Sequence, residues 1–242
     1  MDKLIFTAVS GAERLMRAQQ VHANNLANAD TTGFRASMES ASSQQLGGFG
    51  YDDRNLSSLQ ADTISTRAGT IRETGRPLDV AIAGQGYLAV QDGNGEAYTR
   101  SGDIEIGPDG ALSVHGHPVL GEGGPIVLPQ HTAVEIATDG TISVLTEGAN
   151  QMQVVDRLRL VNADGSELTK NGAGLLVARD GASLAADPNV KVRPRALEGS
   201  NVSAVEEMVA TMDLNRSFEI QMRLFKASDD MNSTGNKLIS GS

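Results

Sequence analysis

The spacing of hydrophobic residues changes twice along the chain, from helical spacing to a period of two and back to helical spacing. This succession restricts the fold more than any other feature of the sequence. Residues 1–28 repeat apolar or small side chains on a heptad count, and residues 200–238 return to helical spacing. Between about 67 and 195 the period is two, in runs of five or six residues such as LDVAIA and GYLAVQ. The pattern predicts one helix near each end of the chain and short strands between them.

The N-terminal helix is expected to end in ANNLANADTTGFR, residues 23–35. Asn and Asp compete with the helix for backbone hydrogen bonds, so their density here indicates where the backbone leaves the helix. The inner face predicted for this helix combines apolar and polar positions: Ile5, Ala8, Ala12, Leu15, Gln19, His22 and Leu26.

The C-terminal helix is expected within residues 196–242, with Ser200 or Asn201 as its cap and Glu206 and Glu207 near the positive end of its dipole. Two such mixed helices would be marginal in water, so each is expected to pack on the other, with further copies completing the burial. The polar positions are open to two interpretations, as solvated side chains or as residues that fix register in an assembly. The face predicted for this helix comprises Val205, Met208, Met212, Asn215, Glu219 and Met222.

Asp-Gly pairs begin at positions 92, 109, 139, 164 and 180, with Asn-Gly at 171, and such pairs between alternating runs predict hairpins. The expected fold is α+β, with long N- and C-terminal helices forming a coiled-coil inner domain and a central all-β antiparallel domain between them. Four segments follow from this: residues 1–35 as helix and turn, 36–66 as an extended connector rich in Ser, Gln, Gly and Asp, 67–195 as the β-domain, and 196–242 as the second helix.

Composition argues against several functional classes. The net charge is −10 with no basic stripe, which disfavours binding to nucleic acid or to an anionic membrane surface. The chain has no cysteine, so disulfides and thiolate metal sites are excluded. No run of apolar residues is long enough for a membrane span, and the apolar run near the start is too short for a cleavable signal. The sequence therefore favours a cytoplasmic chain or one exported by a route that reads no such signal.

Three stretches resemble chemical motifs, but each favours a turn. GQGYLA, residues 84–89, has the letters of a dinucleotide fingerprint, although a strand and not a helix follows it. DGNGEAYTRSGD resembles a calcium loop through Asp92, Asn94 and Glu96, but Gly and Glu are missing where the loop needs them.

His115 and His117, with His131 nearby, lie in a Gly-Pro turn without carboxylates at ligand spacing. No nucleophile motif is present, whereas a carboxylate pair for sugar hydrolysis stays open because Asp and Glu are plentiful. No metal site or cofactor is expected.

Three ordered stretches resemble the bacterial flagellar rod and hook family. They are ANNLANADTTGFRA; GRPLDVAIAGQGYLAVQ with YTRSGDIEIGPDGAL; and LEGSNVSAVEEM. GHPVLGEGGPIVLP, the chain length and the closing KLISGS favour a proximal rod member, with a distal rod or hook-type protein as the alternative. The residues of the first stretch that match the family's motif are Asn24, Asn25, Leu26, Ala27, Asn28, Thr32, Gly33 and Phe34.

The resemblance implies a structural subunit of the flagellar basal body, whose rod crosses the periplasm and transmits torque. Its implied partners are further copies of itself, neighbouring rod proteins and the flagellar type III export apparatus, with the surrounding P-ring or L-ring as open candidates. It further implies export without a cleavable signal peptide, a coiled-coil tube of terminal helices inside the β-domains, and no enzymatic activity. Two other classes remain as alternatives: a carbohydrate-active or proteolytic enzyme, and a periplasmic β-domain binding module.

Overall fold

The computed structural model describes residues 2–45, 55–93 and 95–240, which divide into two units. The helical unit comprises Met1–Ala27, Ser37–Asp62 and Ser203–Ser242, and the β unit comprises Asn28–Ala36 and Thr63–Val202. Neither unit is one continuous stretch of chain, because the turn after the first helix belongs to the β unit and the chain then returns to the helical unit.

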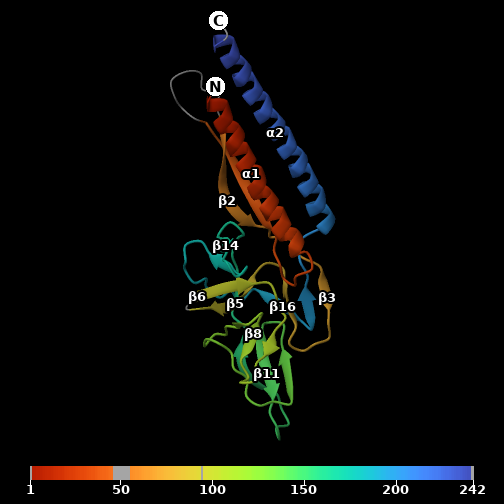
Figure 1. The fold of residues 1–242 in the computed structure, drawn as a ribbon. Coiled ribbons are helices and arrows are strands. Elements are labelled where there is room, and N and C mark those ends of the chain that lie inside the picture. The colour runs from red at the N-terminus through yellow and green to blue at the C-terminus, as the bar shows by residue number, and fades with distance from the viewer. Residues whose placement is uncertain (1, 46–54, 94, 241–242) are drawn as a thin grey trace. The chain divides into compact units, whose positions relative to one another are not determined.

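The helical unit contains α1 (Asp2–Ala27) and α2 (Ala204–Ser240), the two helices in the described part of the chain. They run antiparallel and side by side (Figure 1). β1 (Ser37–Gln45) and β2 (Asn55–Ile64) form a two-stranded sheet, and β1 contacts α1. Most of the stretch expected as an extended connector is therefore strand.

The prediction of an inner domain formed by two long coiled-coil helices is wrong. α1 has 26 residues and α2 has 37, so the N-terminal helix is the shorter, and the other regular structure of the described residues is seventeen strands in six sheets. The apolar members of the face predicted for α2 are exposed: Val205, Met208, Met212 and Met222 are 71%, 47%, 68% and 47% exposed. A mixed α+β composition is consistent with the structure, but a pair of long coiled-coil helices is not.

The physical reason is that α2 has apolar residues on more than one side, so a heptad count alone cannot tell which side meets α1. The less exposed positions of α2 recur every three or four residues, which is the spacing of one helix face. They are Ala204, Glu207, Ala210, Thr211, Leu214, Phe218 and Gln221.

The start of α2 also differs from expectation. The backbone N–H of Glu206 donates to Ser203 Oγ at 3.4 Å, so Ser203 occupies the capping position that had been expected at Ser200 or Asn201. Asn201 instead belongs to the β unit, where its side chain binds the backbone of Ala36 and Arg67.

The β unit contains five small sheets, and all the strand pairings described in them are antiparallel. The sheet orders are β13-β5-β6-β15-β14, β10-β11-β12, β7-β8-β9, β16-β4 and β17-β3. The strands are β3 (Ile71–Glu73), β4 (Val80–Ala83), β5 (Tyr87–Asp92), β6 (Gly95–Thr99), β7 (Glu105–Ile106), β8 (Leu112–Val114), β9 (His117–Pro118), β10 (Ala133–Ile136), β11 (Thr141–Leu145), β12 (Gln153–Arg157), β13 (Leu160–Val161), β14 (Leu168–Lys170), β15 (Leu176–Ala178), β16 (Lys191–Pro194) and β17 (Ala196–Glu198).

The core of the β unit lies on both sides of β5. Leu88 and Val90 point into the larger hydrophobic cluster, and Tyr87 and Ala89 point into the smaller one. This alternation follows from the two-residue period of a strand and explains why GYLAVQ is apolar at almost every position.

Candidate functional site

The inner face predicted for α1 includes five residues whose side chains are described. Its described members Ala12, Leu15, Gln19, His22 and Leu26 are all partly buried. The side chains of Ile5 and Ala8 lie outside the described part.

Polar side chains connect α1 to α2. His22 Nδ1 bonds to Glu207 Oε2 in a partly buried position, and Gln19 Nε2 donates to Asn215 Oδ1 at 3.1 Å on the surface. His22 pairs with Glu207, and the earlier residue Gln19 pairs with the later residue Asn215. Residue numbers therefore rise on one helix as they fall on the other, as in antiparallel helices. The polar residues expected in the two faces therefore include one pair that joins the helices, Gln19 and Asn215.

Asn25 has the most buried described side chain of α1, at 2% exposed. Its Nδ2 donates to the carbonyl of Ser37 at 3.0 Å, and the N–H of Ser37 donates back to its Oδ1 at 2.9 Å. The same Nδ2 lies 3.3 Å from Glu207 Oε1. One amide thus holds the end of α1, the start of β1 and the first turn of α2, which gives a physical reason for Asn at this position.

The rest of the motif forms a tight turn inside the β unit. The backbone N–H of Thr31 donates to the carbonyl of Asn28, and Thr31 Oγ1 donates to the Asn28 side chain, both at 3.2 Å. Gly33 follows with φ +68, and its N–H donates to the carbonyl of Glu198 at 2.7 Å. A Cβ at Gly33 would lie 2.1 Å from the backbone nitrogen of Ser101. Glycine is therefore required here by both conformation and space.

The remaining residues of the motif lie before the turn, on α1, or after it, in the β unit. Leu26 is partly buried and Ala27 exposed at the end of α1, where the helix was expected to finish. Asn24 is exposed on α1, whereas Thr32 and Phe34 are partly buried in the β unit. In the structure α1 ends at Ala27, and the chain leaves the helix there.

A buried charge cluster, formed by Arg35, Arg100 and Glu198, lies immediately after the motif. All three residues are at most 4% exposed. Arg35 Nη2 donates to Glu198 Oε1 at 2.8 Å, and Arg100 Nε lies 3.4 Å from Glu198 Oε2. Burial, followed by the positive charge of Arg35, lowers the pKa of Arg100 to about 10. No sequence pattern indicates this cluster, because its members are far apart along the chain.

Lys170 provides a second contact to the motif. Its Nζ lies 3.7 Å from the centre of the Phe34 ring and, within the described residues, has no hydrogen-bond acceptor. Burial lowers the pKa of Lys170 to about 8. Among the described residues, the ring face of Phe34 is the one group that stabilises the buried positive charge of Lys170.

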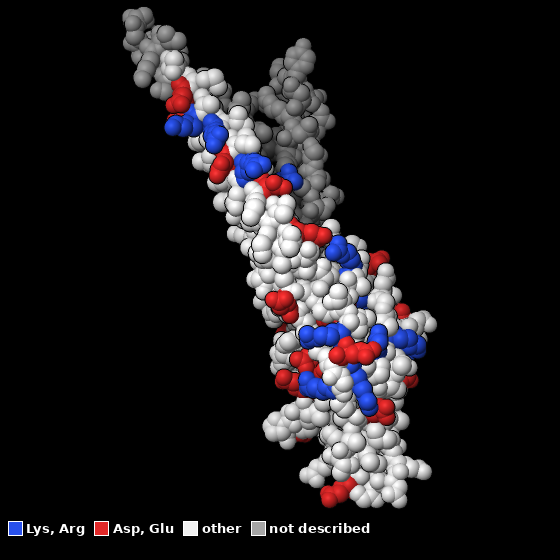
Figure 2. All heavy atoms as spheres, turned by 90° about the vertical axis from the view of Figure 1, so that its right-hand side faces the viewer, with Lys and Arg blue, Asp and Glu red and all other residues white. Residues whose placement is uncertain are grey.

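The exposed side of α2 carries large apolar residues, which we call the α2 outer face. It comprises Val205, Met208, Val209, Met212, Ile220, Met222, Leu224 and Met231, each at least 47% exposed. Charged side chains of both signs also follow α2, with uncharged surface between them (Figure 2). A surface of this kind on a long helix is typical of a protein-protein contact.

The stretches that resemble chemical motifs form turns and strands. Gly84 and Gly86 have positive φ and lead directly into β5, so no helix opens where a dinucleotide would need one. Asp92 accepts a bond from Asn171 at 2.6 Å, and Asn94 lies outside the described residues.

The three histidines have separate surroundings. His115 and Gly116 are the two positive-φ residues of the tight turn between β8 and β9, and His115 Nε2 lies 3.1 Å from the buried Ser101 Oγ. His117 Nδ1 is 3.9 Å from Asp92, and His131 is bonded to the carbonyl of Pro129. Over the described ranges, no three His, Cys, Asp or Glu residues come together as metal ligands would.

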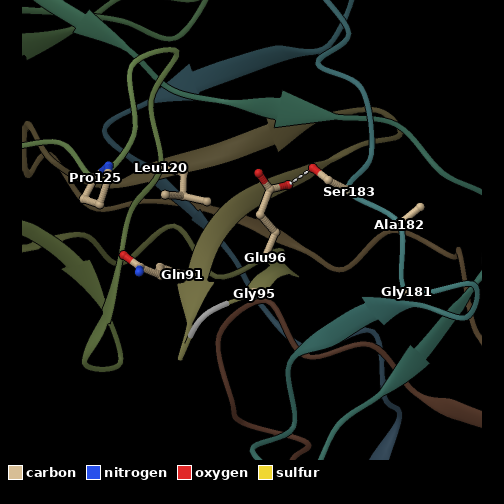
Figure 3. Close-up of a pocket in the computed structure, with 8 residues that line it drawn as sticks. All are labelled: Gln91, Gly95, Glu96, Leu120, Pro125, Gly181, Ala182 and Ser183. Atoms are coloured by element: carbon tan, nitrogen blue, oxygen red, sulfur yellow. Dashed lines mark hydrogen bonds between the residues drawn. The ribbon is translucent and has the colours of Figure 1, made fainter.

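A pocket of about 370 Å³ in the β unit provides a test of the enzyme alternative (Figure 3). Its lining contains one carboxylate, Glu96, which accepts a hydrogen bond from Ser183 Oγ and lies 3.3 Å from Arg159 Nη1. Hydrolysis of a glycoside requires two carboxyl groups across the bond that is cleaved. This pocket therefore lacks the pair of carboxyl groups that a glycoside hydrolase needs.

None of the described helices is long and apolar enough to cross a membrane.

Comparisons with known proteins show which family has these features. Residues 5–35 match the model of the flagella basal body rod protein, residues 81–144 match the flagellar hook protein FlgE/F/G D1 domain, and residues 193–238 match the flagellar basal body rod FlgEFG protein C-terminal model. The flagellar basal-body rod proteins FlgF of Salmonella typhimurium and Escherichia coli are each 41% identical over 99% of this chain and 99% of their own length. The rod protein FlgG of Bacillus subtilis is 28% identical over 96% of this chain and 97% of its own. The resemblance inferred from three sequence stretches is confirmed, and the chain belongs to the FlgF family of flagellar basal-body rod proteins.

Proposed function

We propose that the chain is a structural subunit of the proximal rod of the flagellar basal body and that it assembles with copies of itself and with neighbouring rod proteins to transmit torque. The observation that carries the mode of assembly is the α2 outer face. Burying a large aliphatic or Met side chain stabilises a complex by about 1.5–3 kcal/mol before the costs of association. A row of such side chains on one helix is therefore a strong driving force for binding another subunit.

The relatives support the proximal position over the distal one. Identity is 41% with the FlgF proteins of two enteric bacteria and 28% with a FlgG protein. The distal rod or hook-type alternative is correspondingly weaker.

The assembly interface combines both helices. We assign to it Ile5, Ala8, Ala12, Leu15, Gln19, His22 and Leu26 of α1, and Val205, Met208, Met212, Asn215, Glu219 and Met222 of α2. Within this set, the exposed residues of α2 contact the neighbouring subunit directly, and the partly buried residues of α1 hold α2 in place.

The proposed chemistry is binding alone, without catalysis, metal or cofactor. The separated histidines and the single carboxylate in the pocket support this. We further assign the chain to the part of the rod that crosses the periplasm, to export through the flagellar type III apparatus without a cleavable signal peptide, and to contact with the P-ring or the L-ring through the β unit.

The test is Met212→Asp, which places a charge on the α2 outer face without removing a described contact to α1. Rod assembly and motility are expected to be lost in a strain whose own copy is deleted, because a buried unpaired charge costs several kcal/mol. The matched control is Ser217→Asp, which adds the same charge at an exposed position on another side of the same helix. Normal swimming of the Met212→Asp strain would refute the assignment of this face.

A further inference from the structure

Methionine is concentrated on α2. Four of the eight methionines of the chain are Met208, Met212, Met222 and Met231, and they are 47%, 68%, 47% and 67% exposed. An apolar contact face could be built equally well from Leu, which helix propensity favours about as much as Met. What distinguishes Met from Leu is its thioether sulfur, which can be oxidised.

Three of these methionines lie close together around the helix axis. Met208 and Met212 are one turn apart, and Met222 lies close to four further turns from Met208, so all three lie on one side at 3.6 residues per turn. Leu214, which faces α1, lies on a different side; Met222 lies one turn after Phe218, at the edge of the side that faces α1, and is 47% exposed. The three sulfur atoms therefore belong to the α2 outer face.

The oxidation changes the character of this face. A two-electron oxidant such as hydrogen peroxide transfers one oxygen atom: the S–O bond forms, the O–O bond breaks, sulfur is oxidised by two electrons and the peroxide leaves as water. The sulfoxide is polar, and burying it without a hydrogen-bond donor is unfavourable. Methionine sulfoxide reductases reverse the reaction, so the modification can act as a switch.

We propose that Met208, Met212 and Met222 are an oxidation site that prevents assembly when they carry sulfoxides, and that burial in the assembled rod protects them. This proposal rests on the proposed function, since it requires the α2 outer face to be an interface. The further claim is that peroxide oxidises these methionines before assembly but not after it.

The first experiment measures protection. Full-length free chain and isolated basal bodies are treated with the same dose of hydrogen peroxide, and sulfoxide is mapped by peptide mass spectrometry. The three methionines are expected to oxidise in the free chain and at least about tenfold less in basal bodies, because burial excludes the oxidant. Met152, which is 40% exposed on the β unit, is the internal reference for the peroxide dose. Equal oxidation of the three residues in both samples would overturn the proposal.

The second experiment measures the consequence. The triple variant M208Q/M212Q/M222Q imitates the polarity of the sulfoxide, whereas M208L/M212L/M222L keeps the face apolar and cannot be oxidised. The Gln variant is expected to lose rod assembly and the Leu variant to retain it, with new rods still forming during peroxide exposure that stops wild-type assembly. M152Q is the matched control, and it should assemble normally.

The outcomes separate this proposal from the one on which it rests. If Met212→Asp abolishes assembly but the triple Gln variant assembles normally, the face is an interface and the oxidation proposal is wrong. If both variants assemble normally, the face is not an interface and both proposals fail. If the Leu variant is as sensitive to peroxide as the wild type, another residue is the target and the oxidation proposal is again wrong.

Discussion

Arg35 and Glu198 form a buried ion pair of 2.8 Å that joins the N-terminal turn of the β unit to its last strand. The backbone N–H of Gly69 donates to the same carboxylate oxygen at 2.8 Å, and Arg100 Nε approaches the other oxygen at 3.4 Å. The cluster holds two positive charges and one negative charge. Glu198 is thus the residue on which two buried cations depend.

The first prediction is an asymmetry between the members of this cluster. Glu198→Gln should destabilise the β unit by about 3–5 kcal/mol, because it leaves two buried guanidinium groups facing each other. Arg100→Met should cost less, since it leaves Arg35 and Glu198 as a neutral pair, and adding it to Glu198→Gln should restore part of the loss. Urea denaturation measures the free energies, with the exposed ion-pair variant Glu73→Gln as control at below about 1 kcal/mol. Equal and additive costs would contradict this account.

The second prediction separates conformation from space at Gly33. Gly33→Ala adds a Cβ 2.1 Å from the backbone of Ser101 as well as the strain of a positive φ, so a loss above about 3 kcal/mol is expected. Gly75 has a φ of +77 and no atom within 4 Å of an added Cβ. Gly75→Ala should therefore show the conformational term alone, about 1–2 kcal/mol. Similar melting temperatures for the two variants would show that the turn can move away from Ser101.

The third prediction concerns pH and Lys170. Its pKa is lowered to about 8 by burial, so the folded chain releases this proton near pH 8 and the unfolded chain only near pH 10.5. Protonation therefore opposes folding below pH 8, and this penalty fades as the pH rises toward 10.5. Lys170→Met should stabilise the β unit at pH 7 by about 1–2 kcal/mol, a value reduced for partial solvation and for the lost contact with Phe34.

The gain from Lys170→Met should shrink between pH 7 and pH 9.5, because the wild type loses its own penalty over that range. Paired urea titrations of variant and wild type at the two pH values measure the difference, from which the other titrating groups cancel. Lys191→Met removes an exposed lysine and should give no such trend. A constant gain at both pH values would argue against a lowered pKa.

The fourth prediction tests the amide that holds three elements together. Asn25→Asp keeps the acceptor for the N–H of Ser37 but removes the donor to its carbonyl, and it places a buried carboxylate 3.3 Å from Glu207. A loss of about 2–4 kcal/mol is expected for the helical unit, with faster amide exchange at Ser37. Gln20→Glu makes the matching change at an exposed position of α1 and should leave exchange unaltered. Unchanged protection in Asn25→Asp would show that the bonds to Ser37 are dispensable.

The sequence predicted the elements better than their partners. Local signals suffice for the end of α1 at Ala27, where Asn-rich sequence and turn residues coincide, and for the hairpin turns at Gly116 and Gly140. The side of α2 that meets α1 depends on contacts between residues almost two hundred positions apart, such as His22 and Glu207. Apolar periodicity carries no information on such pairs, and the coiled coil was inferred wrongly for this reason.

The same limit applies to the candidate site. The motif residues were found by their order, but the reason for Asn25 and Gly33 appears only in their contacts with Ser37 and Ser101. The stretch 36–66 was expected to be a connector because its composition is polar, although strands β1 and β2 need little apolar sequence when backbone hydrogen bonds hold them.

The last prediction concerns the C-terminal part of α2 in the free chain. From Met222 to Ala227 every side chain is exposed, whereas Glu207, Thr211, Leu214 and Phe218 recur on the partly buried side of the N-terminal half. An isolated helix has little stability in water, so the second half should open readily until a neighbouring subunit covers it. Amide exchange at micromolar concentration should be at least about tenfold faster from residue 222 onward than at residues 207–218, and assembled basal bodies should remove this difference. Uniform slow exchange along α2 in the free chain would show that the helix needs no neighbour to be stable, and the driving force assigned to its outer face would then be too large.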